Sequence, residues 1–412
     1  MNFFEGNREK LINKLNNNEM VVLFSGKAPK STADALYRFK PNKNFFYFTG
    51  LTKENFSMTI LKTKDKVETK LFIEEPNYDV EKWYGKKMTK EAATEESGID
   101  KVEYEKDFLP YLNKSILEGN AQVVYFDLEK LSWNEAHTYS HKFALEFKEK
   151  YVHIGIKTVH NMVSELRMIK EEYEIDQIRS AMTLTKLGID EIMNNLKPGM
   201  YEYQAESVFN YTITNNGADG NAFDTIAASG GNAVILHHVE NDSKVKKDDL
   251  ILMDLGAQYN QYASDISRTL PVSGKFTERQ KQLYNIVLRA QKEVIEIMIP
   301  GTPFAKMNEV AKEFIAKELI SIGLIEKDED VSKYYYHGVG HYMGLDTHDL
   351  GSREVDLQPG MVITCEPGLY IAEENIGIRI EDDILITEKG NEVLSKAIIK
   401  EVEDIEKFMS NR

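Results

Sequence analysis

The sequence predicts an α/β (α+β) protein of two domains, and three observations support this fold class. The chain has 412 residues, which is the length of two or three ordinary domains. Residues 1–150 alternate strand-like with helix-like segments. The rest begins with a long helical pattern and later holds two pairs of strand-like runs that contain acidic residues. We therefore predict a smaller N-terminal α/β domain over residues 1–160 and a second domain over residues 161–412.

The N-terminal domain is predicted from four apolar runs of strand length. Their sequences are MVVLFSG, FFYFTGL, KLFIEE and AQVVYFDL, at residues 20–26, 45–51, 70–75 and 121–128. Helix-like segments separate these runs, which is the alternation typical of an α/β unit.

The second domain opens with a helical pattern that starts near Ser164 and stops at Pro198-Gly199. The tripeptide EIM that precedes this stop is found again before Pro300-Gly301, 102 residues further along. In both places another helical pattern follows, and then strands. This echo indicates two similar halves, although matches this short also arise by chance.

Composition limits the partners that the protein can have. The chain carries 51 Lys and Arg against 67 Asp and Glu, a net charge of −16, so it repels nucleic acid and anionic membranes. The N-terminal sequence lacks the pattern of a secretory signal, and no apolar run approaches the roughly 20 residues that span a bilayer. Cys365 is the single cysteine, which fits a reducing compartment. We expect no nucleic-acid or membrane partner and a cytoplasmic location.

The first acidic pair lies in residues 249–270, which are predicted to form two strands around a turn at residues 259 and 260. Asp254 lies inside the apolar run LILMDL, where an uncompensated carboxylate would cost several kcal/mol. A turn at this position pairs Asp254 with Asp265, with Cβ atoms about 5 Å apart. Two such anions repel unless one is protonated or a cation lies between them. The alternative is that one of them is an ordinary turn or edge residue.

The second acidic pair lies in residues 361–387, where a turn at residues 373 and 374 places Glu366 opposite Glu381. Pro367 weakens this prediction, because proline cannot donate a hydrogen bond to a partner strand. Four carboxylates and one imidazole make an oxygen-rich site for divalent ions, with room for two ions about 3.5 to 4 Å apart.

The imidazole is expected from the segment HGVGHYMGLDTHD, residues 337–349, which holds three histidines in thirteen positions. Its glycines argue against a zinc-protease helix, because each costs about 1 kcal/mol in a helix interior, and the HExxH glutamate is missing. His341 is the best candidate for a ligand. The alternative for any isolated histidine is an ordinary core or surface residue, but five of the nine fall in the region of the acids: His237, His238, His337, His341 and His348.

These segments resemble the pita-bread metallopeptidases, and most closely the aminopeptidase P (Xaa-Pro aminopeptidase) family. The resemblance rests on MDLGAQYNQYASDISRT, HGVGHYMGLDTHD, CEPGLY and GIRIEDD. It extends to ILHH at residues 235–238, to RMIKEEYEIDQIR at residues 167–179 and, weakly, to NKNFFYFTGL at residues 42–51. It implies a C-terminal pita-bread fold with pseudo-two-fold halves, preceded by a smaller α/β domain.

The resemblance also implies a set of site residues. The metal ligands would be Asp254, Asp265, His341, Glu366 and Glu381, holding two divalent ions, most often Mn²⁺ with Co²⁺ or Zn²⁺ as alternatives. The catalytic residues would be His237, His337, His348, Glu366 and Arg379. Within this set His337 and His348 contact substrate, Glu366 moves the proton, and Arg379 balances the acids.

Two departures from the family pattern concern single positions. Many relatives have a tyrosine near Phe223, so a hydroxyl role there is absent from this chain or filled otherwise. The pattern does not require a histidine at His238, to which we assign no role.

The implied reaction is attack on the peptide carbonyl by a hydroxide that bridges the two ions, which releases the residue before proline. In the family the N-terminal domain packs across subunits and narrows the neighbour's site, so a homodimer or homotetramer is expected. Trp83 resembles a tryptophan that reaches the neighbouring site, while an ordinary partly buried tryptophan is the alternative.

Three other functions remain open. A prolidase, which cleaves only Xaa-Pro dipeptides, has the same metal motif. A creatinase-like amidinohydrolase shares the fold but does not need these five ligands, which disfavours it. A binding protein without catalysis is the third alternative, although such proteins usually lose ligands.

Overall fold

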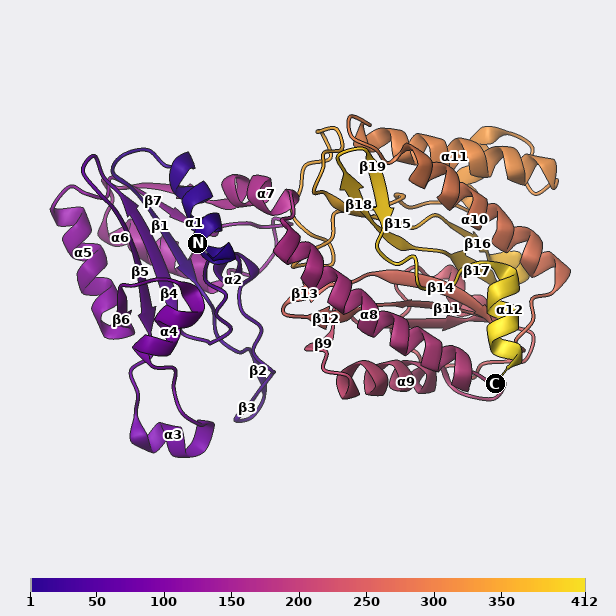
Figure 1. Cartoon of the computed structure of the whole chain (residues 1–412), viewed down its shortest axis with the longest axis horizontal. Helices are drawn as coiled ribbons and strands as arrows, with labels where there is room; N and C mark the ends of the chain where they lie inside the picture. Colours follow the sequence, from indigo (N-terminus) through magenta and orange to yellow (C-terminus); the bar gives the residue numbers. More distant parts are fainter. Residues whose placement is uncertain (1, 412) are drawn as a thin grey trace. The chain divides into compact units, whose positions relative to one another are not determined.

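The computed structural model describes residues 2–411, which divide into two compact units (Figure 1). The first unit ends at Leu166 and the second begins at Arg167, so that helix α7 (His160–Met168) crosses the division. Each unit is described by itself.

The N-terminal unit is built on a six-stranded sheet in the order β6-β5-β4-β1-β7-β8. β4 is antiparallel to both of its neighbours, and the remaining pairs are parallel. The strands are β1 (Glu19–Phe24), β4 (Ser57–Lys62), β5 (Val67–Ile73), β6 (Val102–Tyr104), β7 (Val123–Phe126) and β8 (Gly155–Thr158), and a short hairpin adds β2 (Lys30–Thr32) and β3 (Ala35–Leu36). The helices are α1 (Phe3–Lys14), α2 (Lys43–Thr49), α3 (Tyr78–Tyr84), α4 (Lys90–Ser97), α5 (Phe108–Leu117) and α6 (Tyr139–Lys150).

Alternate residues of β1 face two of these helices. Met20, Val22 and Phe24 pack in one core with Phe108 of α5 and Phe147 of α6. Side chains two residues apart share a face of a strand, so this spacing places the two helices on the same side of the sheet.

The prediction of a strand over residues 45–51 is wrong, because this run forms helix α2. Asn42 precedes the helix, and its side chain accepts a hydrogen bond from the Phe45 amide. Gly50 follows the helix with φ of 73°, a left-handed conformation that glycine adopts without strain. Capping at both ends and burial of almost every side chain outweigh the strand propensity of the aromatic residues.

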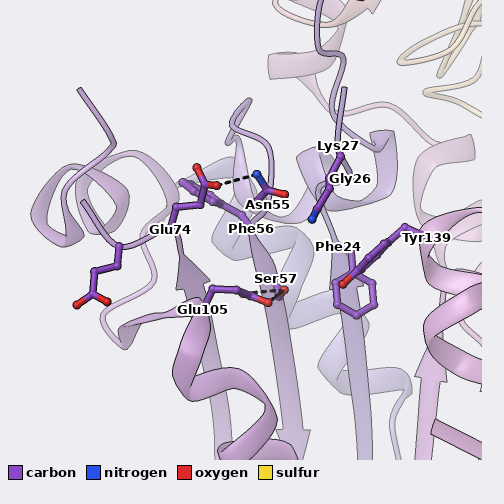
Figure 2. Close-up of a pocket in the computed structure, with 10 residues that line it drawn as sticks. Phe24, Gly26, Lys27, Asn55, Phe56, Ser57, Glu74, Glu105 and Tyr139 are labelled. Carbon is purple, nitrogen blue, oxygen red and sulfur yellow. Dashed lines mark hydrogen bonds between the residues drawn. The ribbon is translucent and has the colours of Figure 1, made fainter. Parts of the chain in front are cut away.

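A pocket of about 360 Å³ lies where β1 and β5 end and β4 begins (Figure 2). Two hydrogen bonds join its polar groups: Ser57 donates to Glu105 over 3.1 Å, and Asn55 donates to Glu74 over 2.7 Å. The rings of Phe24 and Tyr139 meet edge to face on another wall. None of the predicted site residues lines this pocket, so the candidate active site is elsewhere.

Helix α3 carries the tryptophan singled out in the sequence. Trp83 and the neighbouring Tyr84 are 84 % and 82 % exposed, and no residue of the helix is buried. The interpretation of Trp83 as a partly buried residue is therefore wrong for the single chain.

The second unit repeats one order of elements twice. A helix pair comes first, α8 (Glu172–Asn195) with α9 (Glu202–Asn215) or α10 (Glu278–Ile297) with α11 (Phe304–Ser321), and antiparallel strands follow. The two helices of each pair are separated by the Pro-Gly stops, whose Gly199 and Gly301 have φ of 90° and 86°. In Figure 1 some of the strands of this unit are drawn between the two helix pairs. The predicted echo therefore corresponds to two similar halves.

The strands of the first half form two small sheets, in the orders β10-β11-β14 and β13-β12-β9, and those of the second half form β15-β18-β19 and β16-β17. Helix α12 (Val402–Ser410) ends the unit. The bounds are β9 (Gly220–Asn221), β10 (Ile226–Ser229), β11 (Leu250–Leu255), β12 (Ala257–Tyr259), β13 (Tyr262–Ala263), β14 (Ile266–Pro271), β15 (Val362–Cys365), β16 (Gly368–Ile371), β17 (Ile376–Arg379), β18 (Asp382–Thr387) and β19 (Gly390–Val393).

The predicted register of the first hairpin is wrong by two residues. Asp254 lies opposite Ser267 instead of Asp265, because the turn is formed by Asn260 and Gln261. Both turn residues have positive φ, 47° and 71°, as the tight turns that fit the twist of a hairpin require. Since Asp265 is two residues from Ser267, Asp254 and Asp265 still share a face by the two-residue period of a strand.

The predicted register of the second hairpin is confirmed. Val362 pairs with Leu385 on one side of the acids, and Gly368 pairs with Arg379 on the other. Both pairs follow the register that places Glu366 opposite Glu381. Pro367 interrupts the ladder between the two strand segments without shifting it.

Candidate active site

The four predicted acidic residues lie beside interruptions of the two hairpins. Asp254 is near the end of β11, and Asp265 lies between β13 and β14. Glu366 lies between β15 and β16, and Glu381 between β17 and β18. The hairpins touch here, because the Glu381 amide donates to the Ser267 carbonyl over 3.1 Å. Residues more than a hundred positions apart in the sequence are thus brought to one place.

Three of the predicted ligands form a group that is able to hold a metal ion. One ligand atom from each of Asp265, His341 and Glu381 lies within 4.8 Å of the others. His341 Nε2 is also 3.6 Å from Glu366 Oε1. His341 Nδ1 lies 3.0 Å from the Tyr342 carbonyl, which can only accept a hydrogen bond, so Nδ1 is protonated. Nε2 then presents its lone pair to the acids, which is the tautomer that a metal ligand needs.

The charges of the buried carboxylates favour the binding of a cation. Burial, followed by the charge of neighbouring carboxylates, raises the pKa of Asp265 and of Glu381 well above their ordinary values. Burial also raises the pKa of Glu366. Asp254 Oδ1 is buried without a hydrogen-bond partner among residues 2–411. Buried acids that repel one another, with an oxygen left unsatisfied, fit a site for divalent ions.

Arg379 joins the two hairpins through its guanidinium group. It donates to Asp254 Oδ2 over 2.6 Å and to the Ser267 hydroxyl over 2.8 Å. Ser267 in turn donates to Glu381 Oε2 over 2.7 Å. The predicted counter-charge is therefore in direct contact with one acid and reaches a second through a hydroxyl group.

His337 lies against the second hairpin. Its Nδ1 is 2.7 Å from the Gly338 carbonyl, and its Nε2 is 2.8 Å from the Tyr370 hydroxyl. Its Nδ1 is also 4.0 Å from Glu366 Oε2. Burial lowers the pKa of His337 to about 4, so this imidazole is neutral at physiological pH.

His348 and His237 belong to the same cluster. The His348 ring meets the His341 ring edge to face, with centroids 4.2 Å apart. The pKa of His348 is lowered by burial first and then by the charges of His341 and His237. The charge of His237 also acts on the pKa of His337, so His237 is close enough to both rings to influence them.

Sequence reasoning missed three residues of this cluster. The Tyr370 hydroxyl accepts from Arg379 over 3.1 Å, and Ser267 links Arg379 to Glu381. Asp383 accepts from the Asp265 amide over 3.1 Å, and burial raises its pKa to about 8. An acid in the apolar run DDILI was the signal for Asp383, and the CEPGLY segment contains Tyr370. Nothing in the pattern around Ser267 points to its role.

The fold and cluster can be compared with known proteins. The model of metallopeptidase family M24 matches residues 176–388, which include all the predicted ligands. The chain belongs to this family. A second model, the aminopeptidase P N-terminal domain, matches residues 4–125. The resemblance to aminopeptidase P is thus confirmed in both units.

Individual relatives match nearly the whole length of the chain. The Xaa-Pro aminopeptidase of Haemophilus influenzae is 34% identical, over 99% of this chain and 97% of that protein. A Bacillus anthracis structure, solved as a candidate aminopeptidase P, is 47% identical with a TM-score of 0.97, covering 99% of this chain and 98% of the other. Escherichia coli aminopeptidase P, solved with the inhibitor Pro-Leu and in a zinc-substituted form with product, is 30% identical with a TM-score of 0.89, covering 99% of this chain and 98% of the other.

These likenesses confirm the predicted fold class, a pita-bread metallopeptidase unit preceded by a smaller α/β unit. Within residues 2–411, none of the helices is long and apolar enough to cross a membrane.

Proposed function

We propose that this M24 family member is a metal-dependent aminopeptidase that releases the N-terminal residue from peptides with proline in the second position. The observation that carries the proposal is the group Asp265, His341 and Glu381, with ligand atoms within 4.8 Å of one another. The names of the relatives, Xaa-Pro aminopeptidase and aminopeptidase P, support the substrate class. They favour this activity over that of a prolidase.

The proposed cofactor is a pair of divalent ions, Mn²⁺ with Co²⁺ or Zn²⁺ as alternatives. The proposed ligands are Asp254, Asp265, His341, Glu366 and Glu381. Four carboxylates and one imidazole favour hard or borderline cations. When bound, such ions lower the pKa of water and polarise a carbonyl group. The zinc-substituted E. coli relative supports a site that accepts more than one metal.

The protein's own residues then orient the peptide and move the proton. Glu366, with its raised pKa, is the proposed carrier of a proton to the leaving nitrogen. His348 and His337 are neutral and lie beside the ligands, so each is suited to hydrogen bonding with substrate. Arg379 holds Asp254 in place. A proline ring has no amide hydrogen to bind, so its recognition rests on packing and on contacts to the carbonyl before it.

The deciding experiment compares Xaa-Pro-Xaa tripeptides with Xaa-Pro dipeptides in the presence of manganese. We expect cleavage of the tripeptides at the first bond, and loss of cleavage when a chelator removes the metal. A matched tripeptide with alanine in the second position is the control and should be cleaved much more slowly. Cleavage of dipeptides alone would instead identify a prolidase.

A protein that binds no divalent ion under any loading condition would support the binding-protein alternative. Metal analysis of the purified chain after dialysis against manganese, cobalt and zinc measures this. We expect close to two ions per chain for at least one of the metals.

We also propose a homodimer or homotetramer in the cytoplasm, in which residues 1–160 serve oligomerisation and access to the active site. Trp83 and Tyr84 on α3 support this, because two large aromatic side chains more than four-fifths exposed suit a protein contact. Light scattering coupled to size-exclusion chromatography will give the oligomeric state. A Trp83→Ser, Tyr84→Ser variant should weaken the assembly if α3 lies in the contact.

A further inference from the structure

Two of the histidines around the acids are each followed in the sequence by a residue in a buried ionic contact. Asp349 follows His348, and His238 follows His237. Neither contact includes a proposed metal ligand. Both lie within the second unit.

The contact of Asp349 is a buried cluster of charges. Its Oδ2 accepts from Lys170 Nζ over 2.9 Å, and its Oδ1 pairs with the Arg167 guanidinium. The three side chains are at most 2 % exposed. Arg167 also reaches Asp346 over 2.7 Å, so two cations face two anions.

The backbone around this cluster is held closely as well. The Lys170 amide donates to the Gly360 carbonyl over 2.8 Å, and the Asp349 amide donates to the Tyr342 carbonyl over 2.8 Å. At Gly344 an added Cβ would lie 2.4 Å from Asp349 Oδ2, so only glycine allows the carboxylate to sit there. Asp349 is therefore fixed both by its charge partners and by its backbone, and the adjacent His348 meets the His341 ring from this fixed segment.

The contact of His238 is centred on Glu202, which is fully buried at the start of α9. Glu202 accepts from the Ser229 amide over 2.7 Å, from Asn232 Nδ2 over 3.0 Å and from the Ser243 amide over 3.0 Å. His238 Nε2 lies 3.2 Å from Glu202 Oε2, and the His238 side chain is 8 % exposed. The Glu202 carboxylate thus contacts both ends of the segment from Ser229 to Ser243, which contains His237.

We propose that Asp349 with Arg167 and Lys170, and Glu202 with His238, are positioning residues that hold His348 and His237 beside the acidic cluster. The proposal rests on the proposed peptidase function. It assigns a role to His238, for which the sequence pattern indicated none.

A charged contact is suited to holding a histidine in position because its geometry is directional. An apolar side chain can slide or repack at similar volume, whereas a carboxylate between two cations, or one that accepts several N–H groups, has one favourable placement. Replacing a buried ion pair with apolar groups often leaves stability unchanged, so stability alone does not account for these charges. A group that contacts the reacting carbonyl loses on the order of a hundredfold in rate when it is misplaced by about 1 Å.

The first test is a double-mutant cycle of Lys170→Met and His348→Ala. If Lys170 acts through His348, Lys170→Met should lower kcat on an Xaa-Pro-Xaa tripeptide at least tenfold in the otherwise unchanged protein. It should cause no further loss when His348 is already alanine. Bound manganese should not change. Independent effects that multiply in the double variant, or metal loss in Lys170→Met, would overturn the proposal.

Lys281→Met is the matched control for this cycle. Lys281 forms a 3.2 Å ion pair with Glu406 in the same unit, away from the proposed ligands. Its substitution should leave kcat, KM and metal content unchanged.

The second test separates His238→Phe from His238→Gln. Glutamine keeps an N–H donor for Glu202, so it should restore most of the rate that phenylalanine loses. In metal-free protein, the imidazole NMR resonance of His237, identified by its loss in His237→Ala, should shift in His238→Phe and return in His238→Gln. The resonance of His153, in the other unit, should not move. An unmoved His237 resonance, or equal rates in the two variants, would overturn this half of the proposal.

A failure of the proposed function would look different from a failure of this inference. If the unchanged protein with bound metal does not cleave any Xaa-Pro peptide, the function is wrong. The inference on position then still stands or falls on imidazole NMR shifts in metal-free protein, of His237 in the His238 variants and of His348 in Lys170→Met, which need no turnover.

Discussion

The two acidic hairpins of the second unit reach the same result by different local means. In the first, residues 250–271, the ladder is interrupted at Gly256, and Asp254 and Asp265 are not directly opposite. In the second, residues 362–387, the interruption is at Pro367, and Glu366 lies opposite Glu381. The comparison shows that the interruption of the ladder, more than the strand register, determines where the acids lie. In both hairpins the acids lie beside the interruption and face one space.

The hairpins also differ in how their acids are compensated. Asp254 of the first receives a 2.6 Å hydrogen bond from Arg379 of the second. Glu381 of the second accepts a hydrogen bond from the Ser267 hydroxyl of the first, and its pKa is raised by burial and by Asp265. Asp254 of the first hairpin is thus directly paired with the Arg379 cation, whereas Glu381 of the second hairpin has no cation in direct contact among residues 2–411.

The largest expected effect tests this difference. Asp254→Asn and Glu381→Gln should both lose metal and reduce turnover by a factor of a thousand or more, because each removes a proposed ligand. Their effects on the metal-free protein should have opposite signs. Asp254→Asn removes the carboxylate charge that pairs with the buried Arg379 and should lower the free energy of unfolding by about 3 kcal/mol. Glu381→Gln removes a repelled anion and should raise it.

Denaturant unfolding in the presence of a chelator measures both variants against the unchanged protein. Stability changes of the same sign in the two would contradict the assignment of Arg379 to the first hairpin. Unchanged metal content in either would contradict its place as a ligand.

The next effect concerns the segment between the hairpins. His341→Ala should lose metal affinity together with activity. His348→Ala should keep its ions and lose on the order of 3 kcal/mol of transition-state stabilisation, about a hundredfold in rate. Bound manganese and turnover, measured side by side, test the pair. Equal metal loss would mean that both histidines are ligands.

A structural effect of similar size is expected at the interruption of the first hairpin. In Gly256→Ala the new Cβ would lie 1.8 Å from the Ser264 carbonyl oxygen, so the strands must separate. We expect a loss of about 3 kcal/mol of unfolding free energy. The control is Gly390→Ala beside the second hairpin, where nothing lies within 4 Å of an added Cβ. Thermal or denaturant unfolding should separate the two clearly.

The last expected effect is the pH dependence of the stability of the metal-free protein. Burial raises the pKa of Asp383 from 3.8 to about 8 in the folded state. The folded protein therefore holds a proton on Asp383 that the unfolded chain releases, so the contribution of this group to stability is greatest below about pH 4 and falls as the pH rises towards 8. The slope is on the order of 1.4 kcal/mol per pH unit for one group.

Asp383→Asn should reduce this slope in denaturant titrations between pH 5 and 8, and the raised pKa values of Asp265 and Glu381 should maintain the remainder. Bound manganese should also reverse the pH dependence of stability, because bound ions replace the protons of the neighbouring acids. An unchanged slope in Asp383→Asn would show that Asp383 is not one of the titrating groups.

Much of the second hairpin was predictable from the sequence, whereas the first was only partly so. The strand lengths around Glu366 and Glu381 determine a register directly, and Pro367 interrupts it without adding a residue. In the first hairpin the register depends on whether the turn is at residues 259 and 260 or one position later. Neither Asn260 nor Gln261 is glycine, yet both adopt positive φ. That choice depends on the packing of the strands on either side.

The sequence by itself determined the residue types of the site, the acids in apolar runs and the histidine segment, because a buried carboxylate must have a partner wherever it lies. It also determined the two halves, through helix stops and strand patterns that are local in the chain. Only the tertiary structure decided which acid meets Arg379, that residues 45–49 are helical, and that Glu202 and Asp349 hold the segments of His237 and His348. These contacts join residues 36 to 182 positions apart, and no local pattern specifies which of many charged residues will meet once the chain is folded.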